Sequence, residues 1–194
     1  MLMSDRFAYI IQEQPLFSFA RLIAGMRKYG VDLPNPRTGE IRCLTPEGEG
    51  VSASARDIEE WIRAGWTVSF ELWTENDDDL VCCVKTERPL LTEWYSFSNP
   101  ESTAGRLVDL FLDRFAAVHE AGGLLLGVLD MEGVTAEFDW DGFQRQPRDL
   151  PPGASLVALP RARAAALSIP PGYQQIVRGD LLILCAVDIP NGAL

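Results

Sequence analysis

The chain has 194 residues, 47% of them hydrophobic and 23% charged, a composition typical of a water-soluble globular protein. With 28 acidic and 17 basic side chains its formal net charge is -11, and a surface of that charge repels the phosphates of nucleic acid and of anionic lipid. No apolar run approaches the roughly 20 residues that a membrane-spanning helix needs, and the first residues lack the features of a secretion signal. We therefore expect a protein that binds neither nucleic acid nor membranes.

The cysteines and the basic residues indicate a compartment and a source. The four cysteines have neither the spacing of a zinc site nor that of a redox motif, which favours buried, reduced thiols in a cytoplasmic protein. All but two of the 17 basic side chains are arginine, a bias that we attribute to the GC-rich coding of a bacterial genome.

The first third of the chain alternates strands and helices. Apolar periodicity predicts, in order, a strand at 7–11, a helix at 15–29, a brief strand at 41–44 and a helix at 56–64. Pro15 suits the first turn of the first helix, and Ser52 or Ser54 can cap the second. Residues 31–50 are rich in proline and glycine, so we expect a long surface connection there.

A β-meander is predicted next, over about residues 66–97. Residues 66–73 alternate apolar and polar side chains, and residues 80–85 form a second apolar run. The polar and mostly acidic residues 75–79 lie between them, which predicts a hairpin with an acidic tip. A third strand at 91–97 completes the meander, and residues 98–102 turn the chain into a helix.

The remaining elements lead to the carboxyl terminus. In order, we predict an amphipathic helix at 102–121, a buried strand at 124–129, a short strand at 134–138, a turn at 139–143, a strand at 155–159, a short helix at 161–167 and a strand at 181–188. Residues 144–153 form either a loop or a linker before the last strand–helix–strand portion. Because residues 181–187 are too apolar to remain exposed, we expect that portion to pack on the main body.

This order of elements predicts the α+β class. We expect a single domain over residues 1–194, with a largely antiparallel sheet that packs against two or three helices.

No motif identifies an enzyme, a cofactor site or a metal site. The only histidine, His119, falls late in a predicted helix, and one histidine with four scattered cysteines gives no zinc spacing. Asp77, Asp78 and Asp79 are consecutive residues whose side chains diverge, whereas a calcium loop needs alternate ligands around a glycine. The lysine of a P-loop and a GxSxG motif are both missing. We therefore expect no catalytic residue, no cofactor and no bound metal.

Charge and aromatic residues are concentrated in the middle of the chain. Residues 67–141 hold 16 acidic and four basic side chains, whereas the remainder holds 12 acidic and 13 basic ones. Large aromatic rings within an acidic field are typical of a surface that anchors and steers a basic protein partner. The alternative is a set of core aromatics beneath a solubilising acidic face. The partner-binding residues that we predict are Trp73, Asp77, Asp78, Asp79, Trp94, Asp139, Trp140 and Asp141.

The turn around Trp140 is the sharpest form of this hypothesis. An exposed tryptophan flanked by Asp139 and Asp141 can engage an arginine through stacking and ion pairing together.

The acidic strands at 66–84, the helix and strand that follow them and the turn at 138–141 resemble the small, acidic α+β immunity proteins of bacterial polymorphic-toxin systems. The resemblance extends over residues 60–143. It implies a non-catalytic cytoplasmic inhibitor that binds a toxin, here a basic toxin domain, and occludes its active site or its substrate path.

Two other functions stay open from the sequence. An adaptor or secretion chaperone would bind an extended segment of its partner through a sheet edge or an apolar groove. A carboxylate-dependent enzyme would need a pocket with two converging Asp or Glu side chains. The oligomeric state does not follow from the sequence.

Overall fold

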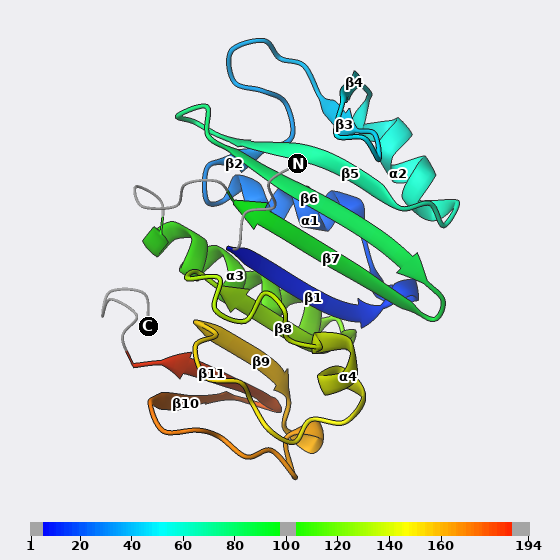
Figure 1. Ribbon diagram of the computed structural model, residues 1–194. Coiled ribbons are helices and arrows are strands. Elements are labelled where there is room, and N and C mark those ends of the chain that lie inside the picture. The colour runs from blue at the N-terminus through cyan, green and yellow to red at the C-terminus, as the bar shows by residue number, and fades with distance from the viewer. Residues whose placement is uncertain (1–5, 98–103, 188–194) are drawn as a thin grey trace.

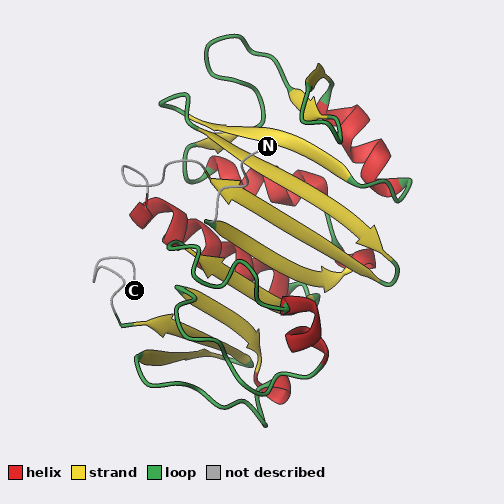
Figure 2. Ribbon diagram, in the orientation of Figure 1, coloured by secondary structure: helices red, strands yellow, loops and turns green. Residues whose placement is uncertain are grey.

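The computed structural model describes residues 6–97 and 104–187. Their strands form one open, 11-stranded sheet in the order β10-β11-β9-β8-β1-β7-β6-β5-β3-β4, and β2 also pairs with β5. Every pair of neighbouring strands is antiparallel. The sheet and its helices confirm the expected α+β class (Figures 1 and 2).

The strands are β1 (Phe7–Glu13), β2 (Val31–Asp32), β3 (Arg42–Leu44), β4 (Gly50–Ser52), β5 (Val68–Thr74), β6 (Asp79–Glu87), β7 (Leu90–Phe97), β8 (Leu124–Asp130), β9 (Leu156–Pro160), β10 (Tyr173–Arg178) and β11 (Leu181–Ala186). The α-helices are α1 (Phe19–Arg27), α2 (Ala55–Arg63), α3 (Ala104–Glu120) and α4 (Trp140–Arg145). Among the described residues, no helix combines the length and the apolar character that crossing a membrane requires.

One face of the sheet is covered by α1, α2 and α3, and α1 and α3 lie behind the strands in Figure 1. Apolar side chains recur at helical spacing in these helices and meet alternate residues of the strands in a continuous core. Gly127 of β8 permits a close approach of Phe115, because a Cβ at Gly127 would lie 2.5 Å from that ring. A larger residue there would therefore push α3 away from β8.

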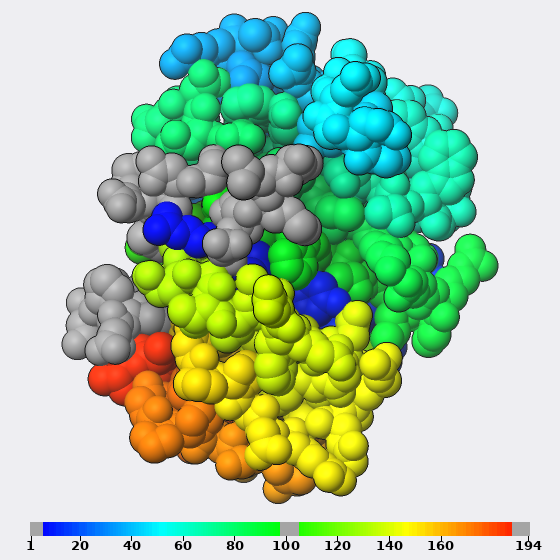
Figure 3. All heavy atoms as spheres, in the orientation of Figure 1, coloured from blue at the N-terminus to red at the C-terminus, as the bar shows by residue number. Residues whose placement is uncertain are grey.

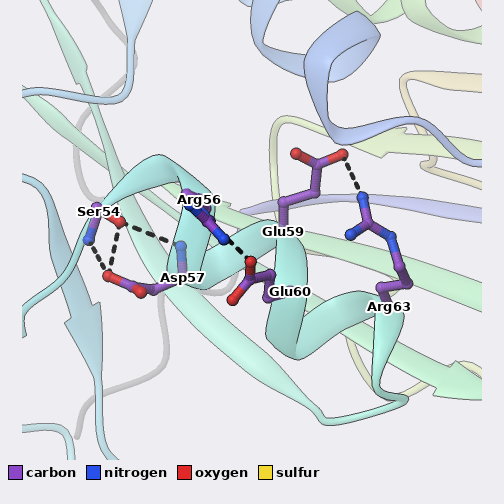
Figure 4. A network of polar contacts seen from close by, with 6 residues as sticks. All are labelled: Ser54, Arg56, Asp57, Glu59, Glu60 and Arg63. Carbon is purple, nitrogen blue, oxygen red and sulfur yellow. Dashed lines mark hydrogen bonds and ion pairs between the residues drawn. The ribbon is translucent and has the colours of Figure 1, made fainter.

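A capping box fixes the start of α2. The Ser54 hydroxyl accepts a hydrogen bond from the Asp57 backbone N–H at 3.2 Å, and the Asp57 carboxylate accepts one from the Ser54 N–H at 2.9 Å (Figure 4). The hydrogen bonds from Ser54 hold the pKa of the Asp57 carboxyl below its ordinary value. Of the two serines expected as caps, Ser54 is therefore the one that acts. Ion pairs one turn apart follow on the exposed side, Arg56 with Glu60 and Arg63 with Glu59.

The opposite face of the sheet is covered over only part of its width. Residues 131–154, which include α4, pack on β1, β8, β9 and β11, and Figure 3 shows them as a yellow-green to yellow layer. Over β5 and β6, no helix in the described part of the chain packs on this face, whereas Leu90 and Trp94 of β7 pack against the cluster that includes α4 (Figure 2). Among the described residues, a second layer therefore covers this face over β1, β8, β9 and β11.

The meander over β5, β6 and β7 is confirmed, with boundaries within two residues of those expected. The first helix is shorter than predicted. Residues 14–16 form a 3-10 turn, and α1 begins only at Phe19 because the Ser18 hydroxyl caps it by accepting from the Arg21 N–H at 3.4 Å.

The strand predicted at 134–138 is wrong. Asp130, at the end of β8, is fully buried and its carboxylate accepts hydrogen bonds from the backbone N–H groups of Glu132, Gly133 and Thr135. These bonds curl the chain into turns in place of an extended strand.

The carboxyl-terminal portion extends the same sheet. The strands expected at 155–159 and 181–188 are present as β9 and β11, but the helix expected at 161–167 is only a 3-10 turn at Arg161–Arg163. β10 was not predicted, because its residues are mostly polar and exposed. Of residues 144–153, where we expected a loop or a linker, the first two belong to α4, and residues 146–153 form a loop with Leu150 in the core. The turn predicted at 98–102 lies outside the described residues.

Candidate functional site

Alternation along β5, β6 and β7 separates their side chains into two sets. Even-numbered residues of β5 and β6 and odd-numbered residues of β7 point to the helices, and the others point away from them. We call the second set the outer face. Its residues are Ser69, Glu71, Trp73, Asp79, Val81, Cys83, Lys85, Glu87, Leu90, Thr92, Trp94 and Ser96.

Strand register places two of the predicted anchors on the outer face. Trp73 lies directly opposite Asp79 on the neighbouring strand, and Trp94 lies directly opposite Cys83. Both tryptophans are half-buried, so part of each ring is accessible. The structure thus places Trp73 and Asp79 side by side, and it places Trp94 on the same surface, opposite a residue four positions further along β6.

Aromatic neighbours on β1 hold Trp94 in place. Its ring stacks on Phe7 with 4.7 Å between centroids and an interplanar angle of 7°, and it contacts the edge of Tyr9 at 5.6 Å. The Tyr9 hydroxyl donates to the Asp141 carboxylate at 2.6 Å. Asp141 therefore lies at the border of the outer face, next to the ring that supports Trp94.

The outer face also contains two polar atoms whose hydrogen-bonding capacity is unused. Glu71 Oε2 and Trp73 Nε1 are buried, and neither has a partner among the described residues. Burial raises the pKa of the Glu71 carboxyl above its ordinary value, although the nearby Arg42 guanidinium opposes the shift. Buried polar groups without a partner are uncommon in folded proteins.

At the acidic tip of the hairpin, Asp77 is engaged in contacts within the protein. Asp77 has a left-handed backbone, with φ at 68°, and its carboxylate accepts from the Asn35 amide at 3.0 Å and pairs with Arg37 at 3.1 Å. Asp78 donates its backbone N–H to Thr74. Asp77 thus anchors residues 33–40 to the tip, whereas Asp79 remains beside Trp73.

The prediction of an exposed Trp140 is wrong. Its side chain is 4% exposed and packs against Phe138 and Phe143, with ring centroids at 4.7 and 5.5 Å. The Asp139 carboxylate accepts from the Gly142 N–H at 2.8 Å and caps α4, so the chain becomes helical where we expected an open turn. The helix directs Trp140 toward the core and leaves Asp141 at the surface side of Tyr9.

A buried polar cluster on the other side of the sheet escaped the sequence analysis. Glu93 is fully buried, and its carboxylate accepts from Gln12, from the Tyr95 hydroxyl and from two N–H groups of Arg114. Burial alone would lower the pKa of the Arg114 guanidinium, but the charge and hydrogen bonds of Glu93, together with the neighbouring Tyr95, outweigh burial and raise that pKa. The cluster therefore joins β1, β7 and α3 through a fully paired charge.

The hydrogen bonds of the cluster engage its carboxylate fully. The Glu93 carboxylate is saturated by donors and so is poorly placed to act as a base. In residues 6–97 and 104–187, no three side chains of the metal-binding types converge.

Comparison with known proteins gives no family for the chain. No protein-family model matches it, and no curated protein matches it.

Cys83 provides a native probe of the outer face. At about pH 8 a thiol reagent is expected to modify Cys83 faster than the other three cysteines. Burial raises the pKa of Cys43 and of Cys185 to about 11, and it raises that of Cys82 well above its ordinary value. The measurement is the rate of modification of each cysteine, followed by peptide mapping, with Cys83→Ser as the control that removes the fast reaction. Equally slow modification of all four would show that the outer face is covered.

Proposed function

We propose that this protein is a non-catalytic inhibitor of the bacterial cytoplasm, an immunity protein that neutralises a cognate toxin through the outer face. The supporting observation is that Trp73, which lies beside Asp79, and Trp94, which lies beside Cys83, are both half-buried on the outer face. Fixed aromatic rings bury large areas at little cost in conformational entropy, and this is why they dominate the binding energy of protein interfaces.

Charge favours a basic partner. The segment that contains the outer face, residues 67–141, holds 16 acidic and four basic side chains. Such a field raises the rate of encounter with a cationic surface, and salt screens it. In this proposal the toxin is contacted or steered by Trp73, Trp94, Asp78, Asp79 and Asp141. Two other aspartates, Asp77 and Asp139, stabilise local structure. Trp140 has no part in binding.

The test begins with the tagged chain as bait in lysate of the source organism. Each captured protein is then expressed in a bacterial host with and without this chain. We expect one captured protein to arrest growth alone and to be neutralised by this chain, and its association rate to fall as salt rises. A partner that is harmless to the host, or an association rate that is independent of salt, would contradict the proposal.

A charge variant tests the steering separately from the contacts. Asp78→Asn with Asp79→Asn is expected to slow association with the toxin, because both carboxylates lie at the end of the outer face. Glu47→Gln with Glu49→Gln makes the same change in net charge at the exposed turn between β3 and β4, and is expected to have a smaller effect. Equal effects of the two pairs would remove any local role of the acidic tip.

An adaptor is the second candidate, favoured by β10. This strand pairs only with β11 among the described strands, and four of its six residues are exposed. An extended segment can add to such an edge through backbone hydrogen bonds. Binding of unfolded peptides from the captured partner, with no loss when Trp73 and Trp94 are replaced, would favour the adaptor over the inhibitor.

The third candidate, a carboxylate-dependent enzyme, would need a suitable pocket. A small hollow lies between α1 and α3, and it does not support this candidate. Its lining contains one carboxylate, Asp113, whereas this chemistry needs two that converge.

A further inference from the structure

A hollow of about 90 Å³ lies between α1 and α3, on the side of the sheet opposite the outer face. Gln12 and Arg114, two members of the buried cluster around Glu93, are part of its lining. The Arg114 side chain is only 10% exposed, so a charged group reaches the hollow from inside the protein.

Small residues of the two helices leave this space empty of side chains. Gly25 of α1 and Ala117 and Ala121 near the end of α3 belong to the lining. A Cβ added at Gly25 would meet no atom within 4 Å. The hollow therefore exists because α1 has no side chain at this position, and a larger residue could fill it without moving the backbone.

The charges around the hollow are mainly positive, although the protein as a whole carries -11. Arg21, Lys28 and Arg114 line it, and the one acidic side chain in the lining is Asp113, which accepts the Tyr29 hydroxyl at 2.7 Å. Among the described residues, Arg21 and Lys28 form no ion pair. Two unpaired cations beside a buried guanidinium are therefore available to an anion.

We propose that this hollow binds a small oxyanion, a phosphate or a carboxylate group. Arg21 of α1 and Lys28, which directly follows α1, approach the anion from either side of Gly25. Arg114 and Gln12 lie at the inner side. Arg114 keeps its ion pair with Glu93, which fixes the guanidinium, so the energy of binding comes mainly from the two unpaired cations. The size of the hollow suits a group of a few non-hydrogen atoms, and its distance from the outer face makes this site independent of the toxin.

The test is a titration of the full chain with inorganic phosphate and, separately, with acetate, by calorimetry at constant ionic strength. We expect one of the two to saturate the protein with Kd of about 1 mM or tighter. Amide NMR shifts during the same titration are expected to be largest at Gly25 and Arg114. Saturation by phosphate alone or by acetate alone supports the site and identifies the oxyanion.

Three variants make the test specific. Arg21→Gln with Lys28→Gln is expected to weaken binding at least about tenfold, which corresponds to about 1.4 kcal/mol. Gly25→Leu, which fills the hollow, is expected to abolish it. Arg27→Gln with Arg56→Gln removes the same charge from exposed ion pairs outside the lining, and it is expected to bind as the wild type does. Circular dichroism shows that each variant is folded.

The proposal is overturned by either of two results. One is that neither anion saturates the wild-type protein below about 10 mM. The other is that folded Arg21→Gln with Lys28→Gln, or folded Gly25→Leu, binds the anion as tightly as the wild type.

Discussion

Replacement of Glu93 by glutamine is expected to lower the free energy of unfolding by about 3–5 kcal/mol, because it leaves a buried guanidinium without its counter-charge. Glu93 is fully buried and the Arg114 side chain is 10% exposed, so solvent compensates little of the loss. The carboxylate also accepts from Gln12 and Tyr95, and a neutral amide would mismatch some of these donors.

Urea denaturation followed by circular dichroism measures this effect. The matched control is Arg63→Gln, which breaks the exposed pair with Glu59 on α2 and is expected to cost only about 0.3–0.5 kcal/mol. A double variant, Glu93→Gln with Arg114→Met, is expected to lose less stability than the sum of the single variants, since it removes both charges together. A loss below about 1 kcal/mol for Glu93→Gln would show that this cluster is not a fixed, desolvated pair.

The second large effect concerns affinity for the toxin. Trp73→Ala and Trp94→Ala are each expected to weaken binding by at least about 2 kcal/mol, or roughly 30-fold, if these rings are the anchors of the interface. Calorimetry or surface plasmon resonance with the purified partner measures the change. The expected loss is mainly in the dissociation rate, because the rings make contact only after encounter.

Trp66 is the matched control for this experiment. It is 60% exposed and stacks on Trp61 of α2, away from the outer face, so Trp66→Ala is expected to leave affinity nearly unchanged. Because Trp94 also supports Phe7 and Tyr9, the stability of each variant is measured alongside, and Trp94→Phe keeps part of that packing. Equal losses from all three alanine variants would argue against a localised interface.

The local elements followed from the periodicity of the sequence, whereas their order in the sheet did not. Residues 66–73 and 91–97 alternate so regularly that both the strands and the faces of Trp73 and Trp94 could be anticipated. The insertion of β1 between β7 and β8 depends on pairing between residues far apart in the sequence, such as Phe7 with Ser96 and Phe7 with Asp130. No local pattern encodes such a pairing.

The errors at the site have specific physical causes. Trp140 was assigned to the surface because two aspartates flank it, but one of these caps α4 and the ring packs in the core. Glu93 carried a usable signal, since the alternation of β7 places it on the same side as Leu91 and Tyr95. A charged residue at an inward position predicts a buried partner. The partner of Glu93 is Arg114, which lies on α3. The sequence does not indicate this pairing, and only the fold shows it.

The reactivity of Cys83 in the free protein and in the complex tests most directly whether the outer face binds the toxin. This thiol lies opposite Trp94 at the centre of the outer face, and no residue needs to be introduced. We expect fast modification in the free protein and at least about tenfold slower modification once the toxin is bound, with recovery when Trp94→Ala weakens the complex. The same fast rate in the free protein and in a saturated complex would place the interface elsewhere on the molecule.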